Sequence, residues 1–209
     1  MPRALPVGVA PDESAAPIAH RLAVPVTSSL DRRPRTAPPP DGDSDASLIE
    51  AIRRGDHHAF EVLYDRHSGW VLALAMRFLG DRDDALDVLS ETFEYLAGRV
   101  GTLTLTTSLR GFLYPAVRHR AIDKVRSRQR HVDVEDLVLV ETSGSPDWMK
   151  PDLRRALAAL PGAQRETVLM RFGDGFSLKE IAEALAVPEG TVKSRLHHAL
   201  LSLRRFLGP

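Results

Sequence analysis

Hydrophobic residues recur with helical spacing through the first folded part of the chain. A short apolar face covers residues 48–52 and ends at Gly55, a residue type that often terminates helices. A second face runs from residue 60 to residue 78 and becomes apolar almost all round, which is typical of a central helix. The pattern therefore predicts two consecutive helices, of which the second is buried.

The next segment, residues 83–96, carries two stripes at helical spacing. One is apolar and is expected to be buried: Leu86, Leu89, Phe93 and Leu96. The other, called the acidic stripe below, consists of Asp84, Asp87, Glu91 and Glu94. Like charges at these spacings repel by about 0.2–0.5 kcal/mol per pair, and the helix interior holds no Lys or Arg to offset them. A solvated face is the ordinary interpretation, and a basic protein partner is the sharper alternative.

A strongly basic helix is expected to follow a Thr-rich loop. Ser108 can cap this helix, and residues 108–130 carry seven Lys or Arg side chains against one acid. Tyr114 and His119 lie among the cations, which suits single-stranded or distorted nucleic acid, because rings stack on exposed bases while cations hold phosphates. The alternative is an Arg-rich surface helix. Pro115 is expected to kink the helix unless it lies in the first turns.

The C-terminal part of the chain has the pattern of a helix-turn-helix. A short helix ends at Pro161, and a second closes at residues 173–175. Ser177 and Glu180 have the spacing of a capping box at the start of a third helix, and a fourth helix follows Pro188. The fourth helix is expected to bury Val192, Leu196, Ala199, Leu203 and Phe206.

Polar side chains cover the opposite face of this last helix. A short helix, a tight turn and a second helix with cations near its start are typical of a helix placed in the DNA major groove, although an ordinary helical hairpin has the same geometry. In the first interpretation Lys193 suits a phosphate contact, and Ser194 suits either a phosphate or a base. Arg195 and His198 suit base acceptors.

Composition divides the chain into four parts. Lys and Arg total 28, as do Asp and Glu, but residues 46–130 carry 13 basic and 11 acidic groups and residues 151–209 carry nine and six. Nine of the 15 prolines lie in residues 1–45, and residues 131–150 hold one basic and five acidic groups. We therefore predict an all-α fold with a disordered Pro-rich tail (1–45), a first helical module (46–130), a flexible acidic linker (131–150) and a second helical module (151–209).

Missing residue types and patterns exclude several classes of protein. The chain has no cysteine, which excludes disulfides, thiolate metal sites and thiol nucleophiles. It has no run of about 18 apolar residues, so a cytoplasmic protein is expected and membrane insertion is not. His57, His58 and His67 lack a recognised metal-ligand spacing, and neither a Ser/His/Asp array nor a phosphate-binding glycine loop is visible. No metal, cofactor or enzymatic activity is predicted, and a metal-dependent enzyme is a minor alternative.

Short motifs, in this order and spacing over residues 46–207, make the chain resemble a known family. In the first module they are Arg54-Gly55-Asp56, Ala59-Phe60, Asp87 to Phe93, Phe112-Leu113-Tyr114 and Arg120-Ala121-Ile122-Asp123. In the second module they are Leu160-Pro161, Gln164-Arg165, Glu180-Ile181-Ala182 and Gly190 to Leu196. Together they resemble a bacterial RNA polymerase sigma factor of the extracytoplasmic-function (ECF) group.

The resemblance implies sigma domains two and four, which bind core RNA polymerase and direct promoter-specific initiation without catalysis. It implies that the acidic-stripe helix binds the clamp helices of the largest polymerase subunit, through Asp84, Asp87, Ser90, Glu91 and Glu94. It implies that the basic helix and the loop from Arg99 to Thr107 recognise and melt the minus-ten element and flip out a non-template base, through Arg110, Tyr114, Arg118, His119, Arg120, Lys124 and Arg126. The last helix would read the duplex minus-thirty-five element through Thr191, Lys193, Ser194, Arg195, His197 and His198.

A further partner and an alternative function complete these expectations. Many members of the family are held inactive by an anti-sigma factor, so the resemblance implies such a partner. The alternative is a stand-alone helix-turn-helix regulator that binds duplex DNA without polymerase. That regulator needs only the second module and leaves the acidic stripe and the basic helix without a role. Duplex binding measured with and without core polymerase separates the two functions.

Overall fold

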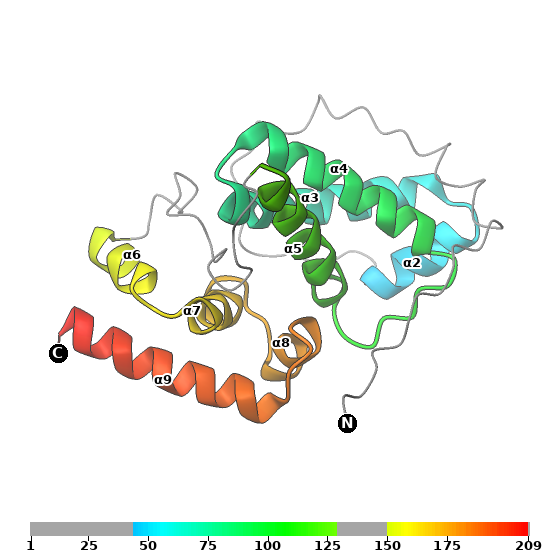
Figure 1. The fold of residues 1–209 in the computed structure, drawn as a ribbon. Coiled ribbons are helices and arrows are strands. Elements are labelled where there is room, and N and C mark those ends of the chain that lie inside the picture. The colour runs from blue at the N-terminus through cyan, green and yellow to red at the C-terminus, as the bar shows by residue number, and fades with distance from the viewer. Residues whose placement is uncertain (1–43, 129–149, 209) are drawn as a thin grey trace, which may run out of the picture.

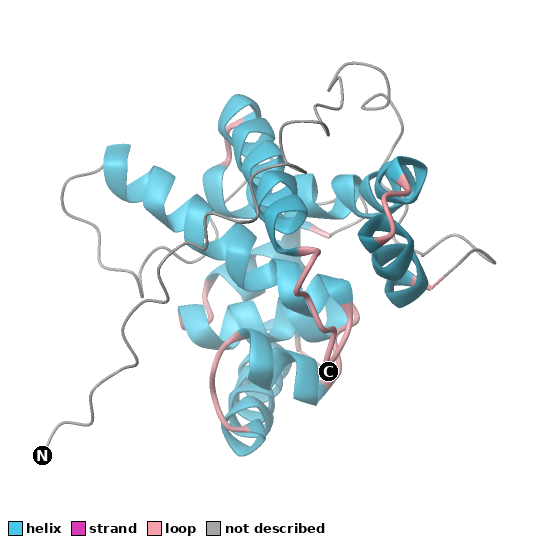
Figure 2. Cartoon of the chain, turned by 90° about the vertical axis from the view of Figure 1, so that its right-hand side faces the viewer, coloured by secondary structure: helices cyan, strands magenta, loops and turns pink. Residues whose placement is uncertain are grey.

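The computed structural model of the chain describes residues 44–128 and 150–208. Among these residues the regular structure is helical, and Figure 2 shows helices joined by loops. The all-α fold class is therefore confirmed for this part of the chain. No helix described here combines the length and apolarity needed to cross a membrane. The predictions for the Pro-rich tail and the acidic linker lie outside the described residues.

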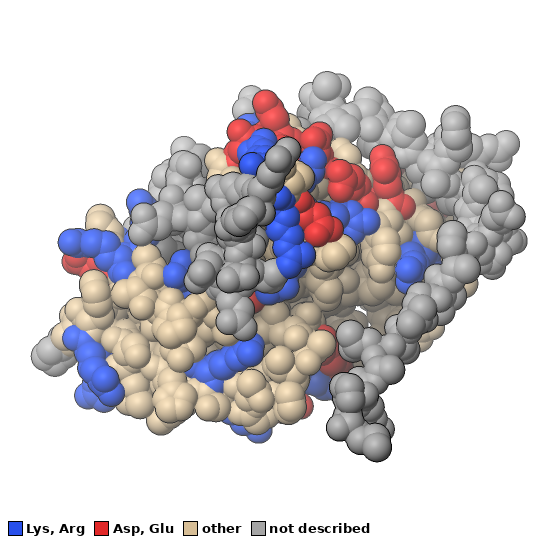
Figure 3. All heavy atoms as spheres, viewed as in Figure 1, with Lys and Arg blue, Asp and Glu red and all other residues tan. Residues whose placement is uncertain are grey.

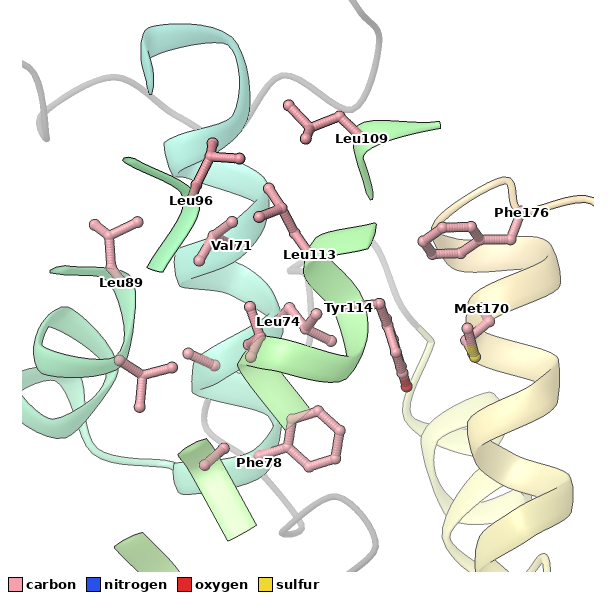
Figure 4. Packing of buried hydrophobic residues seen from close by; sticks show 14 of the residues in the cluster. Val71, Leu74, Phe78, Leu89, Leu96, Leu109, Leu113, Tyr114, Met170 and Phe176 are labelled. Carbon is pink, nitrogen blue, oxygen red and sulfur yellow. The ribbon is translucent and has the colours of Figure 1, made fainter. Parts of the chain in front are cut away.

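Four helices form the first module, α2 (Asp45–Arg53), α3 (His57–Leu79), α4 (Arg82–Arg99) and α5 (Leu109–Arg128), as Figure 1 shows. Helix α3 contacts each of the other three, as its nearly continuous apolar pattern predicts. Val71 and Leu74 on α3 are buried close to Leu96 on α4 and Leu113 on α5 (Figure 4). The core of this module is therefore built around α3.

Side-chain caps determine where these helices begin. Asp56 accepts hydrogen bonds from backbone N–H groups in the first turn of α3, and Asp81 does the same for α4. Between them Gly80 ends α3 with a positive φ of 68°, which glycine adopts without strain. This short connection lets α4 pack back along α3.

Helix α5 continues through Pro115. Its predicted cap is present, because the backbone N–H of Gly111 donates to the Ser108 hydroxyl at 3.2 Å. Pro115 lies in the second turn on an exposed position, and the helix assignment is unbroken across it. The missing N–H of Pro115 therefore leaves only a carbonyl of the first turn without its helical partner.

The second module contains α6 (Pro151–Ala158), α7 (Gly162–Val168), a π-helical stretch η2 (Leu169–Gly173), α8 (Leu178–Ala184) and α9 (Glu189–Leu207). Helix α9 lies along α6, α7 and α8 (Figure 1). The capping box predicted at Ser177 and Glu180 is present. Helices α8 and α9 form the predicted helix-turn-helix, with Ala186 in the turn at a φ of 53°.

Two aromatic side chains of the second module lie in solvent. The apolar spacing predicts Phe206 on the buried face of α9, but its residue is 53% exposed. It lies in the last turn, where residues 204–208 are all exposed because the helix extends into solvent. Phe172 is 63% exposed because it lies in η2, where the wider π-helical turn rotates side chains away from their α-helical positions.

The π-helical stretch also positions the loop that follows it. The backbone N–H of Asp174 donates to the Leu169 carbonyl, five residues earlier, at 3.0 Å. The N–H of Phe176 donates to the Met170 carbonyl at 3.0 Å, and Gly175 turns the chain between them with a φ of 78°. As a result, Asp174 and Phe176 both reach the first module.

The two modules pack against each other. Helix α5 contacts α8, and the ring of Phe176 meets the rings of Trp70 on α3 and Tyr114 on α5 edge-on. The centroid distances are 6.1 Å to Trp70 and 5.8 Å to Tyr114. Figure 4 shows Tyr114 between the helices of the first module and the ribbon that carries Met170 and Phe176. The periodicity of the two modules predicts neither this contact nor its position.

Candidate functional site

The acidic stripe occupies the solvent-facing side of α4. Its last three members are exposed, and Asp84 is half-buried. The apolar stripe of the same helix is buried apart from Leu86, which is half-buried. Ser90 is half-buried and donates its hydroxyl to the Leu86 carbonyl at 3.1 Å. Both predicted stripes of this helix therefore lie where their spacing places them.

Cations of α5 lie beside the acidic stripe. The ion pairs are Lys124–Asp87 (3.0 Å), Lys124–Glu91 (3.8 Å), Arg120–Glu91 (3.7 Å) and Arg128–Asp84. Figure 3 shows acidic and basic side chains interleaved where α4 and α5 lie side by side. The hydrogen bond with Asp87 raises the pKa of Lys124 above its usual value. Because Asp87 and Glu91 are exposed, such pairs contribute about 0–1 kcal/mol each and exchange partners readily.

The structure divides the seven nucleic-acid candidates on α5 among different surroundings. Arg120 and Lys124 face the acidic stripe. His119 and Arg126 are exposed, and a carboxylate oxygen of Asp123 lies 3.1 Å from Nε2 of His119. The remaining three lie on the side that faces α3 and the second module. The basic helix therefore does not present its candidates on one continuous face.

Two of these three residues meet one carboxylate of the second module. The phenol of Tyr114 donates to Oε1 of Glu166 at 2.9 Å, and Nε of Arg118 donates to the same oxygen at 2.8 Å. Tyr114 is 2% exposed and the Glu166 side chain 7% exposed. Burial, together with the neighbouring Glu166 carboxylate, raises the pKa of Tyr114 well above its usual value. In this arrangement the phenol of Tyr114 is covered.

A second carboxylate of the second module binds two residues that the sequence did not single out. Nε1 of Trp70 donates to Oδ1 of Asp174 at 3.0 Å, and Nη2 of Arg77 lies 2.8 and 2.7 Å from the two carboxylate oxygens. The Asp174 side chain is 7% exposed. The guanidinium of Arg110 lies 5.4 Å from the Trp70 ring centroid. Because Asp174 stands between two glycines, it has the composition of an ordinary turn, and the sequence carries no signal of this pairing.

The loop between α4 and α5 forms a hollow that α8 borders. The hollow measures about 120 Å³ and is lined by Thr104, Leu105, Thr106, Thr107, Ser108, Gly111, Phe112 and Glu183. The Ser108 hydroxyl donates to Oε1 of Glu180. Although burial alone would raise the pKa of Glu180, hydrogen bonds from Ser108 and Ser177 hold it below its usual value. The ring of Phe112 stacks on Tyr95 of α4, with centroids 5.8 Å apart.

The last helix presents its candidate residues differently. Lys193, Ser194, His197 and His198 are exposed, and Thr191 and Arg195 are half-buried. The opposite face of α9 buries Val192, Leu196, Ala199 and Leu203, as predicted. Lys193 has an ion pair within its own helix, with Glu189 at 3.9 Å. The polar face of α9 is thus accessible while the two modules are in contact.

Two of the three histidines considered as metal ligands, His58 and His67, lie close to carboxylates of the first module. Nε2 of His67 lies 3.0 Å from a carboxylate oxygen of Asp45, which also binds Arg66 at 2.7 Å. Although burial alone would raise the pKa of Asp45, these two contacts hold it below its usual value. His58 lies 3.2 Å from Glu61. Within the part of the chain that the structure describes, no group of three His, Asp or Glu side chains could hold a metal ion.

Comparison with known proteins matches both modules. The Sigma-70 region 2 family matches residues 63–131, and the Sigma-70, region 4 family matches residues 151–203. The ECF RNA polymerase sigma factor SigM of Mycobacterium tuberculosis is 31% identical over 167 residues, which cover 79% of this chain and 85% of that protein. SigL of the same species is 33% identical over 155 residues, covering 68% and 85%. SigW of Bacillus subtilis is 26% identical over 176 residues, covering 76% and 94%.

Two solved structures resemble the fold. The structure of CnrH in complex with the cytosolic domain of CnrY aligns with a TM-score of 0.56 and 22% identity, covering 79% of this chain and 97% of that chain. The sigma factor RpoE in complex with the anti-sigma factor NepR, from Bartonella quintana, aligns with a TM-score of 0.55 and 25% identity. That alignment covers 71% of this chain and 96% of that chain. The helical architecture is therefore shared with solved proteins.

Proposed function

Because this chain belongs to the ECF group of RNA polymerase sigma factors, we propose that its two modules bind core RNA polymerase and two promoter elements together. As a member of this family it takes part in promoter-directed initiation of transcription by RNA polymerase. Its own contribution is binding, since the covalent chemistry of RNA synthesis belongs to core polymerase. It works where the polymerase works, in the cytoplasm.

The acidic stripe of α4 is the proposed contact with the clamp helices of the largest polymerase subunit. Its support is the row of carboxylates on one side of the helix, three of them exposed. The ion pairs with α5 are weak enough for a basic partner to replace them. Such a replacement frees Arg120 and Lys124 to hold DNA phosphates, so polymerase binding and DNA binding by this module favour each other.

Helix α9 is the proposed reader of the minus-thirty-five element. Its support is the accessible polar face, where Lys193 and Ser194 lie near the start of the second helix of a helix-turn-helix. Lys193 is placed to hold a phosphate, and Arg195 and His198 to donate to base acceptors in the major groove. Thr191 and His197 flank these residues on the same helix.

The loop after α4 and the basic helix α5 are the proposed site for the minus-ten element. Support comes from the hollow in this loop, with the ring of Phe112 in its wall, and from the exposed His119 and Arg126. Flipping a base into such a site costs a few kcal/mol, which stacking and phosphate contacts offset. Tyr114 and Arg118 can contribute only after the second module moves away, because both donate hydrogen bonds to Glu166 while the two modules are in contact.

The observation that carries the proposal is that one chain joins an exposed acidic stripe to an accessible helix-turn-helix face. The experiment is run-off transcription with purified core polymerase on a library of genomic promoters. Core polymerase with this chain is expected to start at a defined subset of templates, and core polymerase alone is not. A chain that programmes no start on any template, while binding one duplex equally with and without core polymerase, is instead a stand-alone regulator.

An inhibitory protein partner is also proposed. RpoE is solved in complex with the anti-sigma factor NepR, and CnrH in complex with the cytosolic domain of CnrY. By similarity with these proteins, we propose that an anti-sigma factor binds this chain as well. Affinity purification of the chain from its own cells should retain such a protein, and adding that purified protein to the run-off reaction should suppress initiation.

A further inference from the structure

One arginine of the first module joins the end of α2 to the loop that follows α4. Arg53 lies in the last turn of α2. Its Nε donates a hydrogen bond to the Val100 carbonyl at 3.0 Å, and its Nη2 donates to the Leu103 carbonyl. These two acceptors lie 47 and 50 positions further along the chain. The guanidinium therefore fixes the first part of the loop from a separate helix.

Both acceptors belong to buried residues at the point where α4 ends. Val100 is the C-cap of α4, and carbonyls at this end of a helix lack the N–H partner that a continuing helix would supply. Val100 and Leu103 are both buried, and a buried carbonyl without a partner is unfavourable. A cation at the C-terminal end of a helix also interacts favourably with the helix dipole. Arg53 therefore stabilises the end of α4 and the start of the loop through charge-assisted hydrogen bonds.

The guanidinium of Arg53 is itself held in place by its own helix. Glu50, one turn earlier, accepts a hydrogen bond from its Nη1. The apolar face of α2 is buried, so the helix that carries the guanidinium has a fixed position: Leu48, Ile49 and Ile52. A planar guanidinium with three of its nitrogens engaged has a defined orientation. Arg53 is therefore a rigid support for the loop.

The loop that Arg53 supports presents hydroxyl groups to solvent. Leu103 is buried, and Leu105 packs against the hydrophobic core. The threonines at the alternate positions are exposed: Thr102, Thr104 and Thr106. A threonine hydroxyl can both donate and accept a hydrogen bond, so it can bind either a base edge or a phosphate. The inward leucines and the anchored carbonyls together determine where these hydroxyls lie.

We propose that Arg53 is a positioning residue for base choice, because it holds the loop so that the threonine hydroxyls meet particular bases of the minus-ten element. This inference rests on the proposed function, which places the minus-ten element at this loop. Arg53 acts through the loop and does not contact DNA, since its nitrogens are engaged with Glu50 and two carbonyls. A hydroxyl distinguishes bases only when donor and acceptor are aligned, whereas phosphate contacts are insensitive to sequence. Displacing the loop should therefore relax the choice of sequence more than it weakens binding.

The direct test compares variants of the full-length chain bound to core polymerase. Arg53→Met removes the donors and keeps the length of the side chain, whereas Arg53→Lys keeps the charge and replaces the planar group by a single nitrogen. The control is Arg54→Met, which makes the same change at the exposed arginine next in the chain. The probe is a duplex with a preformed bubble that carries the minus-ten element of a promoter found by run-off transcription, together with its single-base variants.

Both Arg53 variants are expected to reduce the preference for the native minus-ten sequence over its single-base variants by about tenfold, because one aligned base contact supplies discrimination of that order. Arg54→Met is expected to keep the wild-type preference. Binding of core polymerase and of a minus-thirty-five duplex should be unchanged in all three variants. A merely structural role weakens the binding of every probe alike, so a uniform loss overturns the inference, as does an unchanged preference. Should Arg53→Met not fold, Arg53→Lys decides by the same criteria.

Amide hydrogen exchange tests the positioning role without DNA or polymerase. In the free full-length chain, exchange over residues 101–107 is expected to be several-fold faster in both Arg53 variants and unchanged in Arg54→Met, while α3 keeps its wild-type exchange. The N–H of Thr102, which donates to the Arg99 carbonyl at 3.0 Å, should report the change. Unchanged exchange in the loop overturns the inference. If wild type initiates on no template, the proposed function fails and the role in base choice fails with it, whereas faster exchange still identifies Arg53 as the residue that holds the loop.

Discussion

The two DNA-binding surfaces proposed for this sigma factor are presented in opposite ways. The polar face of α9 lies in solvent, and its exposed cation Lys193 pairs only weakly within its own helix. On α5, by contrast, Arg118 binds the second module, and Arg120 and Lys124 lie beside the acidic stripe. A free basic surface attracts the phosphates of any sequence, so internal partners reduce such binding. The difference shows that the availability of cations, rather than their number, distinguishes the two surfaces.

Reversing the acidic stripe should have the largest effect. It removes the carboxylates that pair with Arg120 and Lys124 on α5, and it also removes the proposed contact with polymerase. Asp87→Arg plus Glu91→Arg place like charges beside Lys124. Co-purification with core polymerase should fall to background while thermal unfolding shows a retained fold. Glu61→Arg plus Asp65→Arg, which reverse two exposed acids at the same spacing on α3, should keep core polymerase bound. Normal core binding by the stripe variant would remove the stripe from that interface.

On the open surface, Arg195→Ala should weaken binding of the holoenzyme to minus-thirty-five duplexes by about 1–3 kcal/mol and relax its choice of sequence. The reason is that a guanidinium bound to base acceptors distinguishes one base pair from another. Lys193→Ala should instead weaken all sequences alike and lower the salt dependence. Competition binding against a set of duplex variants at two salt concentrations separates these outcomes. A uniform loss for Arg195→Ala reassigns it to a phosphate.

On α5, His119 is one of the candidates that is exposed while the two modules are in contact. It is expected to bind DNA when the strands separate. His119→Ala is expected to reduce open-complex formation several-fold, with a smaller effect on closed-complex binding, because its ring can stack on an unpaired base. Permanganate footprinting measures melting, and band shifts measure closed complexes. His58→Ala changes another exposed histidine of the same module and serves as the control. Normal melting by His119→Ala excludes it from the site.

The smallest expected effect is a pH dependence of the contact between the two modules at Ser108 and Glu180. The pKa of Glu180 lies below its usual value of 4.5, partly through Ser108 on the first module. The charged contact is therefore complete above that pH and is lost as the pH falls below it through the lowered pKa. The distance between fluorescent labels on α4 and α9, measured by energy transfer on the wild-type chain, should lengthen slightly in this acid range. The same distance in Glu180→Gln should depend less on pH. Glu189→Gln, away from the contact, should retain the wild-type dependence, and an unchanged profile in Glu180→Gln would rule out this contribution.

Most of the helices could be predicted because their signals are local. The capping box at Ser177, the helix end at Gly80 and the apolar face of α3 depend on residues a few positions apart. Predictions were wrong where the surroundings decide the outcome. Phe206 follows the apolar spacing of α9, but the helix extends beyond its supporting neighbours at that point. The exposure of Phe172 also depends on its surroundings, because a π-helical turn rotates its side chain outward.

In the candidate site, too, the features of single helices could be predicted and the contacts between helices could not. The exposed face of α9 and the two stripes of α4 follow from side-chain spacing on single helices. The pairing of Lys124 with Asp87 joins residues 37 positions apart, and that of Arg118 with Glu166 joins residues 48 positions apart. No spacing rule connects such residues, because the partner of a charge depends on which helices the fold brings side by side.

The sequence by itself therefore determined the helical elements, the arrangement of acids and cations on them, and the family to which the chain belongs. Only the tertiary structure decided that the basic helix meets its own acidic stripe and that Asp174 and Glu166 reach across to the first module. The physical reason is that helix formation and capping act over a few residues, whereas the burial of a carboxylate depends on the arrangement of the whole fold.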